Sequence, residues 1–210
     1  SQHELEVRNR IMEIFIASSG DQLYSDILEF VLELLKSEFG TFGYFGENGK
    51  FIVPALTREI FWEKCDISDK DISFNESDFG GVWKKAVADR KTCFDNKGPF
   101  KVPDGHIKIS NTLVTPIVYQ DKLISAIHIA NKRGGYNEND KNLIDTISSL
   151  IAPYLYSKLE KEKAEKERAR IRVDLVDSQH RLNSFTNSAP DGFVLLDSDL
   201  NVTDINNVAL

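Results

Sequence analysis

The chain has 210 residues, of which 41% are hydrophobic, and this content excludes wholesale disorder because it can bury a core. A net charge of −7 argues against sequence-independent nucleic-acid binding, which needs a basic face. Two cysteines are too few for a secreted disulfide scaffold, and no apolar run approaches the ~20 residues of a membrane span. We therefore expect a cytoplasmic protein without nucleic-acid or membrane partners, and the missing initiator Met indicates a segment of a longer chain.

Two amphipathic helices are predicted at the start. Apolar residues recur at i, i+3, i+4 and i+7 within residues 5–16 and again within residues 23–35. The Ser-Ser-Gly-Asp sequence of residues 18–21 separates the two periods. We therefore expect the first helix to end there and the second to be capped there.

The period then changes to that of β-strands. Residues 41–45 and 51–56 are rich in aromatic and β-branched side chains, and the Asn48-Gly49 pair between them is typical of a hairpin turn. A short helix is predicted over residues 79–87, followed by a loop rich in Gly, Pro and Lys over residues 95–105.

A second hairpin is predicted over residues 113–119 and 123–131, around the polar turn Gln120-Asp121-Lys122. A long helix is predicted from Asn139 onward. The order of elements indicates an α/β (α+β) fold in which helices flank one antiparallel sheet.

The long helix becomes highly charged beyond the predicted domain. Residues 158–172 carry seven basic and four acidic side chains. An a/d seam continues through four apolar side chains: Ile171, Leu175, Leu182 and Phe185. Because a helix this polar is unstable alone, we expect a parallel homodimer held by this coiled-coil-like linker and by the N-terminal helix.

The second hairpin and the helix after it carry a family resemblance. Its residues are Pro116-Ile117, Asp121-Lys122-Leu123-Ile124, Ile127-His128-Ile129-Ala130-Asn131-Lys132, Tyr136, Asp140, Leu143, Ile147, Ile151-Ala152 and Leu155. This pattern resembles the second half of a GAF domain. The helix, strand, Asn-Gly turn and strand before it resemble the first half, so a GAF-type sensory fold is implied.

The residues after the helix resemble the opening of a PAS domain, from Phe185 to Asp197 and from Asn201 to Asn206. The implied organisation is a GAF sensor domain over residues 1–158, a helical linker over 159–186 and a truncated PAS start over 187–210. This arrangement is common in sensor histidine kinases, so downstream PAS and kinase domains of a two-component system are implied. An isolated hairpin is marginal in water, so we expect the tail to be disordered, helical by extension, or paired with another chain.

The middle of the GAF region is similar to a subgroup in archaeal and bacterial kinases, some members of which hold haem. That similarity implies His106 as the iron ligand and Cys65 as a second contact, axial or covalent, with no other metal. His128 is a further candidate because its strand neighbours on the same face are alanines. The aromatic residues available for the pocket wall are Phe61, Trp62, Phe79, Trp83 and Phe94. The alternative is that these aromatics form the domain's own core and that His128 is a hydrogen-bonded core histidine.

No catalytic motif accompanies these features, so we expect a regulatory segment and not an enzyme. A GAF-type sulfoxide reductase would rely on clustered cysteines, whereas Cys65 and Cys93 lie 28 positions apart. A ligand-free module that serves only dimerisation and spacing stays open. So does a cyclic-nucleotide-binding GAF domain, because Asn131-Lys132, Tyr136 and Asp140 partly match its signature, although Lys141 stands where an acid is expected.

Overall fold

The computed structural model describes residues 2–46, 48–56, 73–75, 80–100, 108–206 and 208–209. The chain divides into two compact units, Ser1–Ser157 and Lys158–Leu210. The helices are α1 (Gln2–Ala17), α2 (Gln22–Leu35), α4 (Gly81–Asp89) and α5 (Glu138–Ser188). The strands are β1 (Phe39–Phe45), β2 (Phe51–Leu56), β3 (Ser73–Phe74), β4 (Cys93–Asp95), β5 (Thr112–Tyr119), β6 (Lys122–Ala130), β7 (Val194–Leu196) and β8 (Val202–Ile205).

The first unit is built on one antiparallel sheet. Within the described residues its six strands follow the order β3-β2-β1-β6-β5-β4, and every pairing is antiparallel. Strand β1 joins the two predicted hairpins, since it pairs with β2 on one side and with β6 on the other. The predicted mixed fold with an antiparallel sheet and flanking helices is therefore confirmed.

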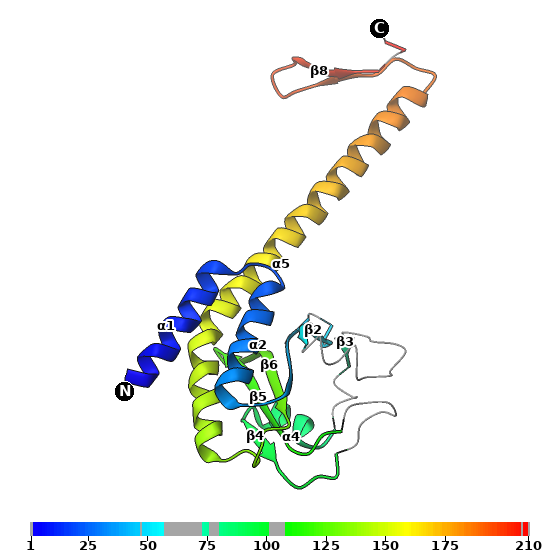
Figure 1. Cartoon of the computed structure of the whole chain (residues 1–210). Coiled ribbons are helices and arrows are strands. Elements are labelled where there is room, and N and C mark those ends of the chain that lie inside the picture. Colours follow the sequence, from blue (N-terminus) through cyan, green and yellow to red (C-terminus); the bar gives the residue numbers. More distant parts are fainter. Residues whose placement is uncertain are drawn as a thin grey trace. The chain divides into compact units, whose positions relative to one another are not determined.

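Helices α1, α2 and the first part of α5 lie on one side of this sheet (Figure 1). The ring of Tyr24 in α2 packs on Phe42 of β1, with 4.9 Å between ring centroids. Gly40 of β1 permits the close approach of α2, because a Cβ there would lie 2.8 Å from the side chain of Leu28. Helix α1 contacts α5 through Phe15 and Tyr154, whose ring centroids are 5.1 Å apart.

The β5–β6 hairpin has the turn that its sequence predicts. Gln120 and Asp121 have φ values of 48° and 61°, as a two-residue type I′ turn requires. Arg90, just after α4, donates a hydrogen bond from Nη1 to the carbonyl oxygen of Asp121 at 2.5 Å. The turn is thus held to the end of α4.

The start of α2 differs in detail from the prediction. Asp21 occupies the N-cap position, but its side chain makes no capping hydrogen bond. Its φ and ψ of −72° and −22° are helical, whereas a capping residue is usually extended. Nearby polar groups instead converge on Asp26, which accepts from the Ser18 hydroxyl and, at 2.6 Å, from Gln22 Nε2.

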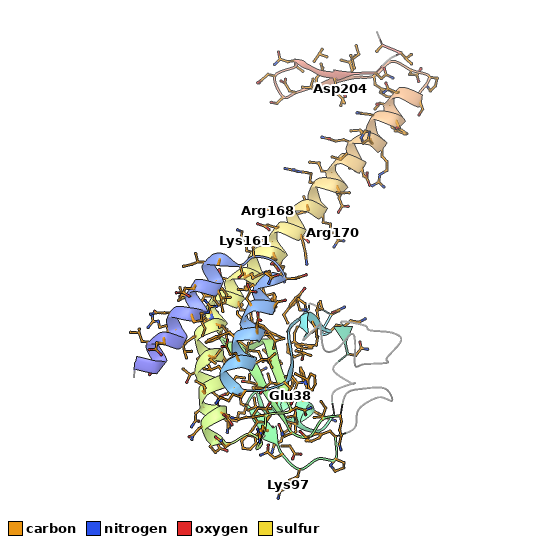
Figure 2. All side chains as sticks on the ribbon, viewed as in Figure 1. Glu38, Lys97, Lys161, Arg168, Arg170 and Asp204 are labelled. Atoms are coloured by element: carbon orange, nitrogen blue, oxygen red, sulfur yellow. The ribbon has the colours of Figure 1, made fainter. Side chains whose placement is uncertain are left out.

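Helix α5 begins in the first unit and continues into the second. Its buried residues, among them Ile144, Ile147, Ile151 and Leu155, all lie in the first unit, and Pro153 lies among them. In the second unit its side chains are largely exposed, as Figure 2 shows for Lys161, Arg168 and Arg170. No helix in the described part of the chain is both long and apolar enough to cross a membrane.

The tail of the second unit forms an antiparallel hairpin, β7–β8, with Val194 opposite Ile205. The tail is therefore neither disordered nor helical, and its pairing with another chain stays a prediction. The Asn206 side chain supplies a reason: its amide nitrogen donates to the carbonyl oxygens of Thr186 and Asp191, and its oxygen accepts from the amide of Phe193 at 2.8 Å. These bonds tie the hairpin to the end of α5.

Candidate ligand-binding face of the sheet

The two faces of the central strands have different neighbours. On β6, Ile127 and Ile129 lie opposite Phe42 and Gly40, the residues of β1 that meet α2. Because side chains alternate along a strand, Ala126 and His128 point to the other face. That second face is the one that α4 covers, since Trp83 of α4 contacts His128.

An aromatic cluster lies on this second face. The indole of Trp83 meets the ring of Phe51 edge-on, with centroids 5.1 Å apart, and Phe45 packs on Phe51 at 5.0 Å. Phe51 belongs to a buried group with Val53 and Ala126. Gly43 makes room for it, because a Cβ at that position would lie 2.9 Å from the Phe51 ring and 2.2 Å from the carbonyl oxygen of Ile52.

His128 is half-buried beside this cluster. Its ring lies edge-on to Trp83, with centroids 5.5 Å apart and an angle of 71° between the ring planes. Its Nε2 shares a hydrogen bond of 2.6 Å with the hydroxyl of Thr112 on β5. The Thr112 hydroxyl thus engages Nε2, and the role of His128 as a ligand contact stays a prediction.

Sequence reasoning did not find Thr112. The signal was present in the hairpin register: with the turn at Gln120-Asp121, Val114 pairs with His128 and Thr112 pairs with Ala130. A threonine two residues from the pairing partner lies diagonally across from the histidine on the same face. A hydroxyl at such a diagonal position is within hydrogen-bonding reach of a histidine on the neighbouring strand.

The other predicted site residues do not all meet here. Phe94 pairs with Leu113, whose partner on β6 is Ile129, so Phe94 lies on the opposite face from His128. The structure therefore does not bring Phe94 together with Trp83. Five predicted residues lie outside the described residues: Phe61, Trp62, Cys65, Phe79 and His106.

The loop between β6 and α5 contains the Lys/Asp pair of the sequence signature. The ammonium of Lys132 donates to Asp140 Oδ1, and Asp140 Oδ2 accepts from the amide of Asn137 at 3.0 Å. Both side chains are largely buried. The pair therefore braces this loop against the first turn of α5.

Tyr136 anchors the same loop from the other side. Its hydroxyl shares a hydrogen bond of 2.8 Å with Ser37, and its backbone amide and carbonyl both bond to the side chain of Asn96. Burial raises the pKa of the Tyr136 phenol, and the bond to Ser37 opposes that rise. The phenol is thus a neutral structural contact at physiological pH.

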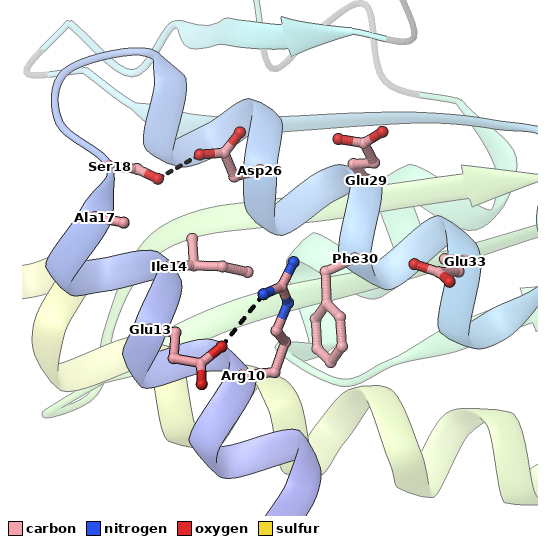
Figure 3. A pocket seen from close by; sticks show the side chains of 9 residues that line it. All are labelled: Arg10, Glu13, Ile14, Ala17, Ser18, Asp26, Glu29, Phe30 and Glu33. Atoms are coloured by element: carbon pink, nitrogen blue, oxygen red, sulfur yellow. Dashed lines mark hydrogen bonds and ion pairs between the residues drawn. The ribbon is translucent and has the colours of Figure 1, made fainter.

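A separate groove lies between α1 and α2 (Figure 3). Its volume is about 460 Å³. It is lined by Arg10, Glu13, Ile14, Ala17, Ser18, Asp26, Glu29, Phe30 and Glu33. Arg10 is paired with Glu13 at 3.2 Å, and Ser18 bonds to Asp26. Because α2 packs on the sheet face opposite His128, this acidic groove is distinct from the Trp83–His128 face.

The described residues contain no group of three or more His, Cys, Asp or Glu side chains placed to hold a metal ion. What they provide on the Trp83–His128 face is an aromatic and apolar wall with one imidazole and one hydroxyl. Phe51, Val53 and Ala126 are fully buried, so this part of the cluster belongs to the domain's own core, with the partly buried Trp83 and His128 at its edge.

Comparison with known proteins agrees with the fold. The GAF domain of a phosphoenolpyruvate-protein phosphotransferase from Acinetobacter matches 78% of this chain and 99% of its own, with a TM-score of 0.58 and 14% identity. The corresponding domain from Coxiella burnetii matches 78% and 96%, with a TM-score of 0.59 and 13% identity. The phycocyanobilin-bound GAF domain of a cyanobacterial phytochrome matches 75% and 96%, with a TM-score of 0.54 and 15% identity. No curated protein matches the chain significantly.

The sequence itself settles the family. The profile of the GAF domain matches residues 17–155, which run from the end of α1 to the last buried turn of α5 and include every strand of the six-stranded sheet. GAF domains are sensory and regulatory modules of signalling proteins. The chain therefore belongs to the GAF domain family.

Proposed function

We propose that this chain is the sensory part of a signalling protein, in which a ligand on the Trp83–His128 face biases a dimeric helical linker. The observation that supports this most is the continuity of α5. The same helix contributes Ile147 and Leu155 to the core of the GAF domain and carries the linker beyond it. A ligand that changes how the domain packs on α5 would thereby act on the linker without any chemistry.

The proposed dimer would be held by the apolar seam of the linker. Ile171, Leu175 and Leu182 are 55–57% exposed and follow the four-three spacing of a coiled coil, with Ser178 between them. Three apolar residues of α1, Val7, Ile11 and Ile14, are already buried within the chain. We therefore assign the seam to α5 first, with the exposed Leu5 and Ile16 of α1 left to contribute.

The dimer is tested by charge placed in the seam. Leu175→Glu combined with Leu182→Glu should give monomers, because like charges would face each other across the two-fold axis. Val173→Glu is the matched control, since Val173 is 60% exposed on the same helix but lies off the seam. Light scattering at tens of micromolar, roughly where a seam this short should pair, provides the measurement. An unmutated protein that is monomeric there, or a control that dissociates equally, rules out this seam.

Haem is the ligand that we propose to test first, with His106 as the iron ligand and Cys65 as a second contact. Of the described side chains, the partly buried Trp83 and His128 are those that a flat macrocycle would meet, with His128 remaining on Thr112. The similar phytochrome domain is phycocyanobilin-bound, and bilins and haem are both tetrapyrroles. Bound haem would supply a redox- or gas-sensitive iron, while this chain's residues would enclose and orient it.

The four histidines allow a sharp test of this ligand. Reconstitution with hemin should give a sharp Soret band, which His106→Ala shifts or abolishes. His180→Ala, on an exposed linker position, is the matched control and should leave the band unchanged. Cys65→Ala should make the haem extractable by acidic organic solvent if its sulfur is bonded covalently. A spectrum indistinguishable from that of free hemin would leave the ligand-free spacer as the better function.

The parent protein is proposed to be a sensor histidine kinase. The β7–β8 hairpin and the residues before it carry the PAS-like sequence, and a PAS domain followed by a kinase would receive the linker's signal. Autophosphorylation of the full-length parent, compared with and without the Leu175→Glu and Leu182→Glu changes, is the direct measurement. A parent chain without a histidine kinase domain contradicts the assignment.

A further inference from the structure

A second groove lies apart from Trp83 and His128, neither of which lines it. It is formed where the end of α4, strand β5 and the first turns of α5 meet, and its volume is about 380 Å³. It is lined by Arg90, Lys91, Thr92, Pro116, Val118, Lys141, Asp145, Ser148 and Ser149. None of these residues belongs to the site described above.

The charge of this groove is opposite to that of the chain. Three of the lining side chains are cationic, Arg90, Lys91 and Lys141, and Asp145 is the only acid among them. The whole chain carries −7. A local excess of positive charge on an acidic protein attracts anions to this place in preference to the surrounding surface.

The carboxylate of Asp145 is hydrogen-bonded to another residue that lines the groove. Its Oδ1 accepts a hydrogen bond from the Thr92 hydroxyl. An ionised carboxylate can only accept, so Thr92 is the donor and must accept from Thr115, whose oxygen lies 2.6 Å from its own. Thr115 then accepts from Ser148 at 3.3 Å. All three hydroxyl protons therefore point along one chain toward Asp145.

The direction of these hydrogen bonds decides which donors remain available for a ligand. The Ser149 hydroxyl also donates its proton within the protein, to the carbonyl oxygen of Asp145 at 2.8 Å. The hydroxyls of the groove therefore have no proton left to donate, and they form a polar wall that does not itself bind an anion. The donors that remain are the guanidinium and the two ammonium groups.

The three cationic side chains line the groove and keep part of their N–H donors available for a ligand. Arg90 spends one N–H on the carbonyl oxygen of Asp121, which fixes its guanidinium and leaves the others of its five donors. The ammonium of Lys141 lies 3.8 Å from Glu138, a carboxylate whose side chain is 71% exposed. Within the described part of the chain, the ammonium of Lys91 makes no hydrogen bond or ion pair.

We propose that this groove binds a phosphate group, either as free phosphate or as the end of a small phosphomonoester. Phosphate has acceptor oxygens on several sides and no need of hydroxyl donors, so it matches three cations that approach from α4 and α5. A single carboxylate has fewer oxygens and less charge, and it matches the groove less well. The site is independent of the sheet-face ligand and of the proposed dimer.

Calorimetric titration with inorganic phosphate at low ionic strength tests the proposal. We expect saturable binding with a Kd on the order of 1 mM, which the double change Lys91→Gln and Lys141→Gln weakens by more than about tenfold. The matched control is Lys84→Gln with Lys85→Gln, which removes the same charge from exposed positions of α4 outside the groove. Binding that is absent, or that weakens equally in the control, overturns the site.

Two further arms define the ligand. Glycerol 3-phosphate should bind with the same dependence on Lys91 and Lys141 if the site accepts a monoester, and phosphate alone should bind if it takes only the free ion; either result supports the site. Acetate at the same ionic strength should bind much more weakly. Acetate that binds as well as phosphate would show only general anion attraction and would overturn the assignment to phosphate.

Discussion

The two parts of α5 place similar apolar residues in opposite surroundings. Ile151 and Leu155, in the GAF domain, are fully buried, whereas Leu175 and Leu182, in the linker, are more than half exposed. The residue types are alike, and both parts are helical. The difference shows that helix formation and core formation are separate properties of this sequence. The first part is stabilised by what it packs against, and we propose that the second part is stabilised by a partner helix.

The strongest test of this difference between the two parts of α5 is the same Leu→Ala substitution in each part. Leu155→Ala should lower the free energy of unfolding by about 3 kcal/mol, because it leaves a cavity in a fully packed core. Leu182→Ala should cost less than about 0.5 kcal/mol in dilute protein, where the linker has no partner. Urea unfolding followed by fluorescence provides both values. Equal costs would mean that Leu182 is buried by a contact within the monomer.

Much of this contrast could be predicted from the sequence. The 3.6-residue period predicted α2, and the Asn48-Gly49 and Gln120-Asp121 turns predicted the two hairpins, because each signal depends only on neighbouring residues. The pairing of β1 with β6 could not be predicted in this way, since it joins Thr41 to His128. The short strands β3 and β4 were missed because two or three residues carry no detectable period.

The candidate site was less predictable than the fold. His128 was selected for its small neighbours, but its bond to Thr112 depends on the exact hairpin register. Phe94 was grouped with Trp83 by residue type alone, and one step of register places it on the other face. Residue type identifies what could line a pocket, whereas strand register decides which residues do.

A second pair of changes compares charged residues of α5. Asp140→Asn should cost about 2 kcal/mol, because it leaves the largely buried ammonium of Lys132 without its carboxylate. Asp177→Asn, at an exposed linker position, should have no measurable effect. Adding Lys132→Met to Asp140→Asn should cost less than the two single changes together. Additive costs in thermal unfolding would show that the two side chains do not interact.

A smaller effect is expected at Tyr136, in the loop that leads into the buried part of α5. Tyr136→Phe should cost about 1 kcal/mol through the lost bond to Ser37. The phenol has a raised pKa in the folded state, so its contribution is complete below the ordinary value of 10.0 and declines as the pH rises above it. The stability of the Phe variant should therefore fall less steeply than that of the unmutated protein above about pH 10. Parallel stability curves in urea between pH 8 and about 11 would contradict this assignment.

The smallest effect is expected from the ion pairs of the linker. Lys161 and Glu165 stand one helical turn apart with 4.0 Å between Nζ and Oε1, and their side chains are 76% and 62% exposed. Water and salt screen such a pair, so Glu165→Gln should change the free energy of unfolding by no more than about 0.3 kcal/mol. Even that small change should disappear in 1 M salt, where the Debye length is about 3 Å. Thermal unfolding at both salt concentrations provides the measurement. A loss several times larger, or one that persists at high salt, would mean that Glu165 contacts a partner helix, and the linker would then be held by charge as well as by its apolar seam.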